Sequence, residues 1–71
     1  MLKNRLKELR KLNNVTQKQV ADGIHLAERN YQRYEAGNYP TYETLLALAN
    51  YFDVSLDYLV GRTDNPSSHK N

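Results

Sequence analysis

The first dozen residues carry leucines at a helical spacing. The intervals are four, three and three residues, which predicts an amphipathic helix with one apolar stripe. Lysines and arginines occupy its other faces. The following pair, Asn13 and Asn14, predicts the end of the helix. The apolar stripe consists of Leu2, Leu6, Leu9 and Leu12.

The stretch from Thr16 to Glu35 predicts two short helices joined by a tight turn. Thr16 is a favourable N-cap, and Gln19 three residues later completes a capping box, in which the two side chains satisfy free backbone N–H groups. Val15 and Val20 bracket this cap as a hydrophobic staple. The inward face of the first of these helices is predicted to be Val20, Ala21 and Ile24.

A second helix, about residues 28–36, follows the turn at residues 23–26. Tyr31 and Tyr34 lie three apart and are predicted to face the core with their hydroxyls at its rim. The opposite face carries side chains that can read DNA bases, since arginine pairs with guanine, glutamine with adenine, and glutamate with the cytosine amino group. A solvated helix face is the alternative interpretation. The residues concerned are Glu28, Arg29, Gln32 and Arg33.

Two further helices are predicted in the second half of the chain. Gly37 is a suitable left-handed residue to end the preceding helix. Thr41 caps the fourth helix, which Asp53 ends, and Ser55 caps a last short helix, which Gly61 stops. The fourth helix has an apolar stripe of Leu45, Leu48, Ala49 and Phe52.

Five helices with short connections predict a compact all-α bundle over residues 1–61. Residues 62–71 are polar and are expected to form a disordered tail. The predicted core comprises Leu2, Leu6, Leu9, Val20, Ala21, Ile24, Tyr31, Tyr34, Leu45, Leu48, Phe52, Leu56 and Leu59.

Composition limits the possible chemistry. The 71 residues include no cysteine, and His25 and His69 lie too far apart to suggest a metal site, so no metal or cofactor is expected. No nucleophile and base pair, paired-carboxylate site or phosphate-cradling glycine loop is evident, and an enzyme is not expected. No apolar run is long enough to span a membrane, and no secretory signal is evident, which predicts a cytoplasmic location.

Charge is distributed unevenly along the chain. Residues 1–37 contain eight Lys and Arg against four acidic residues, whereas residues 38–71 contain two against four. The positive half therefore contains the two-helix unit and favours a polyanion as partner. The basic first helix could also lie on a membrane surface, but its apolar stripe is narrow and lacks Trp and Phe, so membrane binding is not expected.

The order and spacing of several motifs resemble the Cro and phage-repressor (Xre-like) helix-turn-helix family across residues 2–61. The resemblance implies a lambda-repressor-like fold whose third helix enters the major groove of DNA. It implies that Gln17 contacts a phosphate and braces the third helix, and that Arg10 and Glu35 form a structural ion pair. The matching motifs are RLKELR, TQKQVA, RYEAG, PTYETLLALANYF and VSLDYLVG.

Three positions depart from the family pattern. His25 stands where the turn usually has glycine, and histidine tolerates positive φ with some strain. Ala27 replaces the usual Ser or Thr cap of the third helix, which loses about 1 kcal/mol. The loop that follows, residues 37–40, lacks the Lys and Arg that many relatives place against the DNA backbone.

The residues and the resemblance together predict a sequence-specific regulator of transcription that binds double-stranded DNA. A repressor of a phage or mobile element, acting as a homodimer on a palindromic operator, is the expected form. The alternative is a protein-interaction module such as an antitoxin or antirepressor. Expected backbone contacts come from Gln17, Lys18, Asn38, Tyr39 and Tyr42, although the tyrosines are equally consistent with unoccupied surface. An exposed patch of Tyr51 and Tyr58 is the possible dimer interface.

Overall fold

Side-chain caps start three of the helices. The computed structural model describes residues 2–66, which form five helices and no strand, so the all-α prediction is confirmed. Thr16, Thr41 and Ser55 each accept a hydrogen bond from a backbone N–H of the following turn, and Thr16 forms the full capping box with Gln19. The helices are α1 (Leu2–Asn13), α2 (Gln17–Gly23), α3 (Glu28–Glu35), α4 (Tyr42–Phe52) and α5 (Leu56–Leu59).

All five helices end in the same way. A residue with positive φ follows the last turn, and the next backbone N–H donates back to a carbonyl five residues earlier, which is the Schellman pattern. After α2, for example, the N–H of Leu26 donates to Ala21 over 2.8 Å. This ending reverses the chain within two or three residues and explains the short connections. The positive-φ residues are Asn14, His25, Gly37, Asp53 and Gly61.

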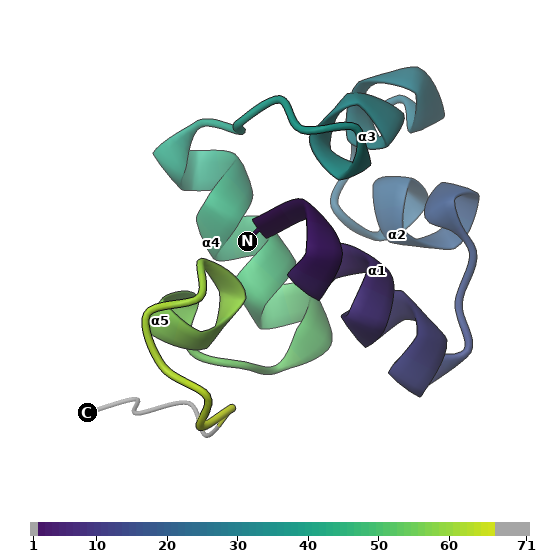
Figure 1. Cartoon of the computed structure of the whole chain (residues 1–71). Coiled ribbons are helices and arrows are strands. Elements are labelled where there is room, and N and C mark those ends of the chain that lie inside the picture. Colours follow the sequence, from purple (N-terminus) through teal and green to yellow (C-terminus); the bar gives the residue numbers. More distant parts are fainter. Residues whose placement is uncertain (1, 67–71) are drawn as a thin grey trace.

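The core forms where α1 crosses between two helix pairs. Figure 1 shows α2 and α3 on one side of α1 and α4 and α5 on the other, and α1 contacts both α3 and α5. Packing of the Tyr51 ring of α4 against α2 depends on Gly23, because a Cβ there would lie only 2.7 Å from Cδ1 of Tyr51. Fully buried side chains from all five helices, Leu6, Val20, Tyr31, Leu48 and Leu59, occupy the centre.

Ten residues of the predicted core are confirmed as buried, and three are less buried than predicted. Ile24, Tyr34 and Leu56 pack against the core but are only half-buried. Leu12 is 71% exposed, although it continues the leucine stripe of α1. Each step along the stripe rotates the side chain around the helix, and at Leu12 the stripe has turned away from the core. Ala49, Val54 and Tyr58 are buried in addition.

The chain after α5 folds back onto the bundle as far as it is described. Asp64 lies 3.6 Å from Arg5 of α1, and the carbonyl of Pro66 accepts a hydrogen bond from the N–H of Ser55. Residues 62–66 of the predicted disordered tail thus have defined contacts, whereas residues 67–71, with His69, lie outside the described part. Among residues 2–66, no helix is both long enough and apolar enough to cross a membrane.

The turn between α2 and α3 stores strain at His25, whose φ is 60°. A left-handed conformation costs an ordinary L residue about 1–2 kcal/mol, and glycine avoids this cost. We therefore expect His25→Gly to be at least as stable as the wild type, and about 1 kcal/mol more stable than His25→Ala. Urea unfolding of the two variants measures the difference. Equal stability of the glycine and alanine variants would contradict a strained turn.

Candidate nucleic-acid interface

A buried carboxylate fixes α3 against its two neighbours. Glu35, at the end of α3, is only 4% exposed and accepts hydrogen bonds from three helices. Arg10 of α1 donates through Nη2 over 2.9 Å and also through Nε, Gln17 of α2 donates over 3.1 Å, and the hydroxyl of Tyr31 donates from one turn earlier in α3. The structure thus contains the Arg10–Glu35 ion pair and the bracing contact of Gln17 that the resemblance implied.

This network stays ionised at neutral pH. Burial by itself would raise the pKa of Glu35, but the hydrogen bonds from its three partners outweigh burial and hold the pKa below its ordinary value of 4.5. The hydrogen bond to Glu35 raises the pKa of Arg10. Burial, followed by the hydrogen bond to the carboxylate, raises the pKa of Tyr31, so its hydroxyl remains a donor. The site is therefore a charged pair with a neutral phenol.

The opposite face of α3 is open to solvent. The four predicted base-reading residues are all exposed. Arg29 and Arg33 lie four residues apart, which places them one above the other on adjacent turns. Ala27 makes no side-chain cap, as its lack of a hydroxyl predicted. The exposed residues of this face are Glu28, Arg29, Gln32 and Arg33.

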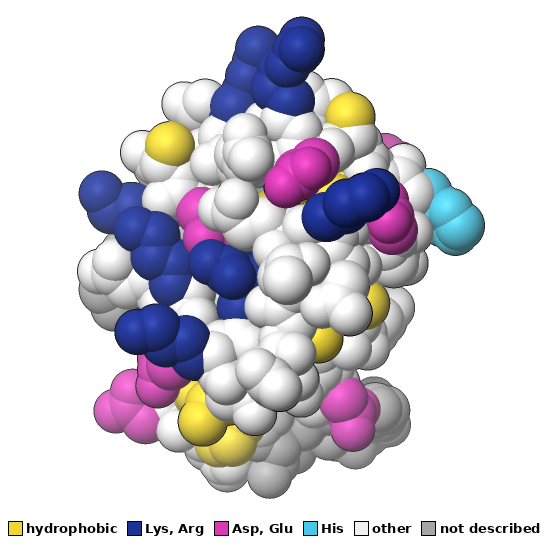
Figure 2. All heavy atoms as spheres, turned by 90° about the vertical axis from the view of Figure 1, so that its right-hand side faces the viewer, with side chains coloured by type: hydrophobic (Ala, Val, Ile, Leu, Met, Phe, Trp, Pro, Cys, Tyr) yellow, Lys and Arg dark blue, Asp and Glu magenta, His cyan; other side chains and the backbone are white. Residues whose placement is uncertain are grey.

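The predicted backbone-contact residues lie on three segments around α3. Gln17 is half-buried because of its bond to Glu35, and Lys18 is exposed and forms an ion pair with Asp22 over 3.2 Å. Asn38 is exposed in the loop after α3. Tyr39 and Tyr42, in that loop and at the start of α4, are each 65% exposed. Figure 2 shows the face that carries α2 and α3, with Lys and Arg side chains gathered along one side and at the top.

The two tyrosines expected at a dimer interface are not an exposed patch. Tyr58 is only 6% exposed, and the guanidinium of Arg5 covers its ring at 3.9 Å from the centroid. Tyr51 is half-buried, packs at a right angle to Phe52 and lies against Gly23. The exposed-patch premise is therefore wrong for Tyr58, and the role of both residues in a dimer stays a prediction.

Sequence reasoning missed two of the contacts that build the site. The hydroxyl of Tyr31 was expected at the rim, but Tyr31 is fully buried and donates to Glu35. Its spacing of four residues from Glu35 within one helix was the available signal. The stacking of Arg5 on Tyr58 joins α1 to α5, and no local pattern in the sequence indicated this pair.

Comparison with known proteins assigns the family. The family model described as "Helix-turn-helix" matches residues 6–59, and the chain belongs to this helix-turn-helix family. It is 43% identical over 63 residues to the uncharacterized HTH-type transcriptional regulator YobD of Bacillus subtilis, covering 87% of this chain and 56% of the relative.

Two more relatives give the same picture. The cryptic phage CTXphi transcriptional repressor RstR of Vibrio cholerae is 42% identical, with 86% of this chain and 55% of the relative covered. The HTH-type transcriptional regulator ImmR of Bacillus subtilis is 39% identical, with 89% and 50% covered. The chain thus spans about half the length of these curated relatives. No solved structure matches it significantly.

Removing Arg10 should destabilise the domain because it leaves the Glu35 carboxylate buried without its ionic partner. For Arg10→Met we expect a loss of about 3–5 kcal/mol in the free energy of unfolding. The double variant Arg10→Met, Glu35→Gln should lose less, since no charge is stranded and the amide oxygen still accepts from Tyr31. Urea unfolding at pH 7 measures both. A double variant as unstable as the single one would show that the stranded charge is not the cause.

The lowered pKa of Glu35 also predicts an acid dependence. Because the folded-state pKa lies below 4.5, the carboxylate stabilises the fold fully above about pH 5 and loses this contribution as the pH falls through the folded pKa. Urea midpoints between pH 7 and pH 3 should therefore fall more steeply for the wild type than for Glu35→Gln. The control is Glu43→Gln, since Glu43 is exposed. If wild type and Glu35→Gln lost stability in parallel, the carboxylate would not be the group that titrates.

Proposed function

We propose that the chain binds double-stranded DNA sequence-specifically and regulates transcription, most simply as a repressor that blocks access to its operator. The observation that carries this proposal is the exposure of Arg29 and Arg33 on adjacent turns of a helix whose inner face is fixed by Glu35. Neither arginine forms an ion pair with any carboxylate of residues 2–66. Both guanidinium groups therefore remain available to guanine edges.

The other two outward residues refine the proposed readout. Gln32 lies between the arginines in sequence and either reads adenine or holds a neighbouring side chain in place. Glu28, in the first turn of α3, either accepts from a cytosine amino group or complements the helix dipole. The N-terminal part of a recognition helix is the part that usually reaches the bases, which favours Glu28 and Arg29 as the deepest contacts.

Phosphate contacts are proposed on both sides of α3. The Gln17 amide has two N–H donors, and the one that bonds Glu35 leaves a second for a phosphate oxygen. Lys18 is on the same helix, and its exposed ion pair with Asp22 is weak enough to exchange for a phosphate. Asn38, Tyr39 and Tyr42 supply uncharged donors from the loop after α3 and the start of α4.

A homodimer on a palindromic operator is part of the proposal. One α3 presents only four base-reading side chains, so two copies on half-sites about one helical turn apart, roughly 34 Å, would supply useful affinity. The name of RstR as a phage transcriptional repressor supports regulation of a phage or mobile element, and the name of ImmR supports regulation of transcription. Such a role places the protein in the cytoplasm with the DNA.

Substituting the arginines tests the assignment. Arg29→Ala and Arg33→Ala should each weaken operator binding by about 1–3 kcal/mol and relax base preference at one position. Selection of bound sequences from a random DNA pool, followed by titration of the selected site, measures both effects. Arg62→Ala removes an exposed arginine beyond α5 and serves as the matched control. Unchanged base preference in both α3 variants would refute the proposed readout.

A further inference from the structure

Three lysines form a row along the exposed side of α1. Lys3, Lys7 and Lys11 are spaced by four residues, and all are exposed. Side chains four apart lie above one another on a helix, with a rise of about 6 Å per step. These three lysines form a lysine ridge that extends over about 12 Å. A row of lysines is also what an ordinary solvent-exposed helix face contains. The position of this row and the absence of carboxylate partners therefore decide whether it binds a ligand.

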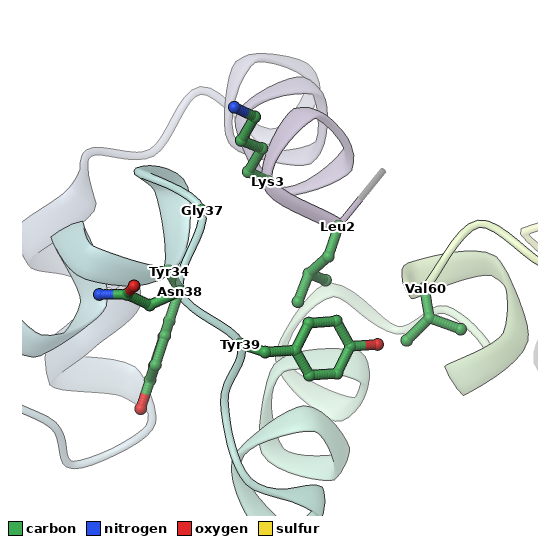
Figure 3. A pocket seen from close by; sticks show the side chains of 7 residues that line it. All are labelled: Leu2, Lys3, Tyr34, Gly37, Asn38, Tyr39 and Val60. Carbon is green, nitrogen blue, oxygen red and sulfur yellow. The ribbon is translucent and has the colours of Figure 1, made fainter.

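The first two lysines of the ridge, Lys3 and Lys7, lie toward the side of α1 that faces α3. Arg10 is seven residues from Lys3 and three from Lys7, so it shares their side of the helix, and Arg10 reaches across to Glu35 of α3. Figure 3 shows Lys3 on α1 beside the end of α3, where it lines a hollow together with Gly37 and Asn38. The ridge thus begins next to the loop that follows α3.

The opposite side of α1 serves another purpose. Arg5 stacks on Tyr58 of α5 and lies 3.6 Å from Asp64. It also lies 3.7 Å from Glu8, the one carboxylate that lines the shallow groove beside Lys7 and Lys11. The arginines of α1 thus join helices, whereas the lysines project to solvent.

The lysines of the ridge are the cations that α1 leaves unpaired. Among residues 2–66, ion pairs engage Arg5, Arg10 and Lys18, and none engages a ridge lysine. The loop at residues 37–41, next to the recognition face, has no Lys or Arg at all. Because Lys18 of α2 is paired with Asp22, the lysines of residues 2–66 that are left unpaired for the DNA backbone all lie on α1.

We propose that the lysine ridge binds phosphates of the DNA backbone flanking the major-groove site of α3. This inference rests on the proposed DNA binding and adds the surface that supplies most of its electrostatic affinity. The ridge binds phosphates without reading bases, so it strengthens binding to matched and unmatched DNA alike. It takes the place of the basic loop that this chain lacks.

The salt dependence of DNA binding tests the ridge. The variant Lys3→Gln, Lys7→Gln, Lys11→Gln should reduce the slope of log K against log salt by about 0.9 for each phosphate that is no longer neutralised, or roughly 2.7 for three. Between about 50 and 200 mM salt, its affinity should then fall about 40-fold less than that of the wild type. Base preference in a random pool should stay unchanged. Arg62→Gln, beyond α5, reports the effect of removing one exposed charge that belongs neither to the ridge nor to the proposed base-reading face.

The outcomes separate the ridge from the proposed function. The ridge inference is overturned if the triple variant changes the salt slope of binding by no more than three times the change that Arg62→Gln causes. This holds even if Arg29→Ala still changes base preference, which would leave the proposed function in place. Wild-type protein without salt-dependent DNA binding overturns both. Ridge-dependent binding to phosphatidylserine vesicles, with an unchanged DNA slope, assigns the lysines to a membrane and refutes the inference. Equal urea midpoints for wild type and triple variant establish that the fold is intact.

Discussion

The structure depends on one buried carboxylate. Glu35 receives hydrogen bonds from Arg10 of α1, Gln17 of α2 and Tyr31 of its own helix, and no other buried polar side chain holds such a position in the described core. A charge in this environment is tolerable only while its partners are in place. Because those partners come from three helices, the electrostatic requirement of one side chain determines how the three helices meet.

The contacts of Glu35 also fix the orientation of the outer face of α3. A helix of eight residues has little stability of its own, so its orientation must come from tertiary contacts. Tyr31 and Glu35 anchor the inner side, and the Schellman endings at His25 and Gly37 set the direction of the chain on both sides. The outward side chains are thereby held at a fixed angle without contributing to the core, which is the condition for rigid presentation to a ligand.

Local sequence patterns predicted what depends on neighbouring residues, and the family resemblance supplied the long-range contacts of Arg10 and Gln17 with Glu35. Contacts between distant segments that neither source indicated were missed. Thr16, Thr41 and Ser55 cap their helices because capping involves only the next turn. Leu12 followed the same periodicity as Leu9 but is left in solvent. The burial of Tyr58 under Arg5, and the contact of Asp64 with that arginine, join the two ends of the described chain. Exposure of the four outward residues of α3 followed from periodicity, but their role on DNA stays a prediction, because the family comparison assigns the family and not the contacts of single residues.

The ion pairs of the fold also determine which positive charges of the chain remain unpaired on the surface. Residues 1–37 carry eight cations and four acidic residues, and three of those acids, Glu8, Asp22 and Glu35, are each engaged by a cation of the same segment. Each ion pair contributes little to the electrostatic potential at a distance, because its two charges cancel. The excess is thus displayed by the lysine ridge and by Arg29 and Arg33, with Glu28 as the remaining acid of this segment. A modest net charge is in this way concentrated on α1 and α3, the two helices that Glu35 and Arg10 hold together.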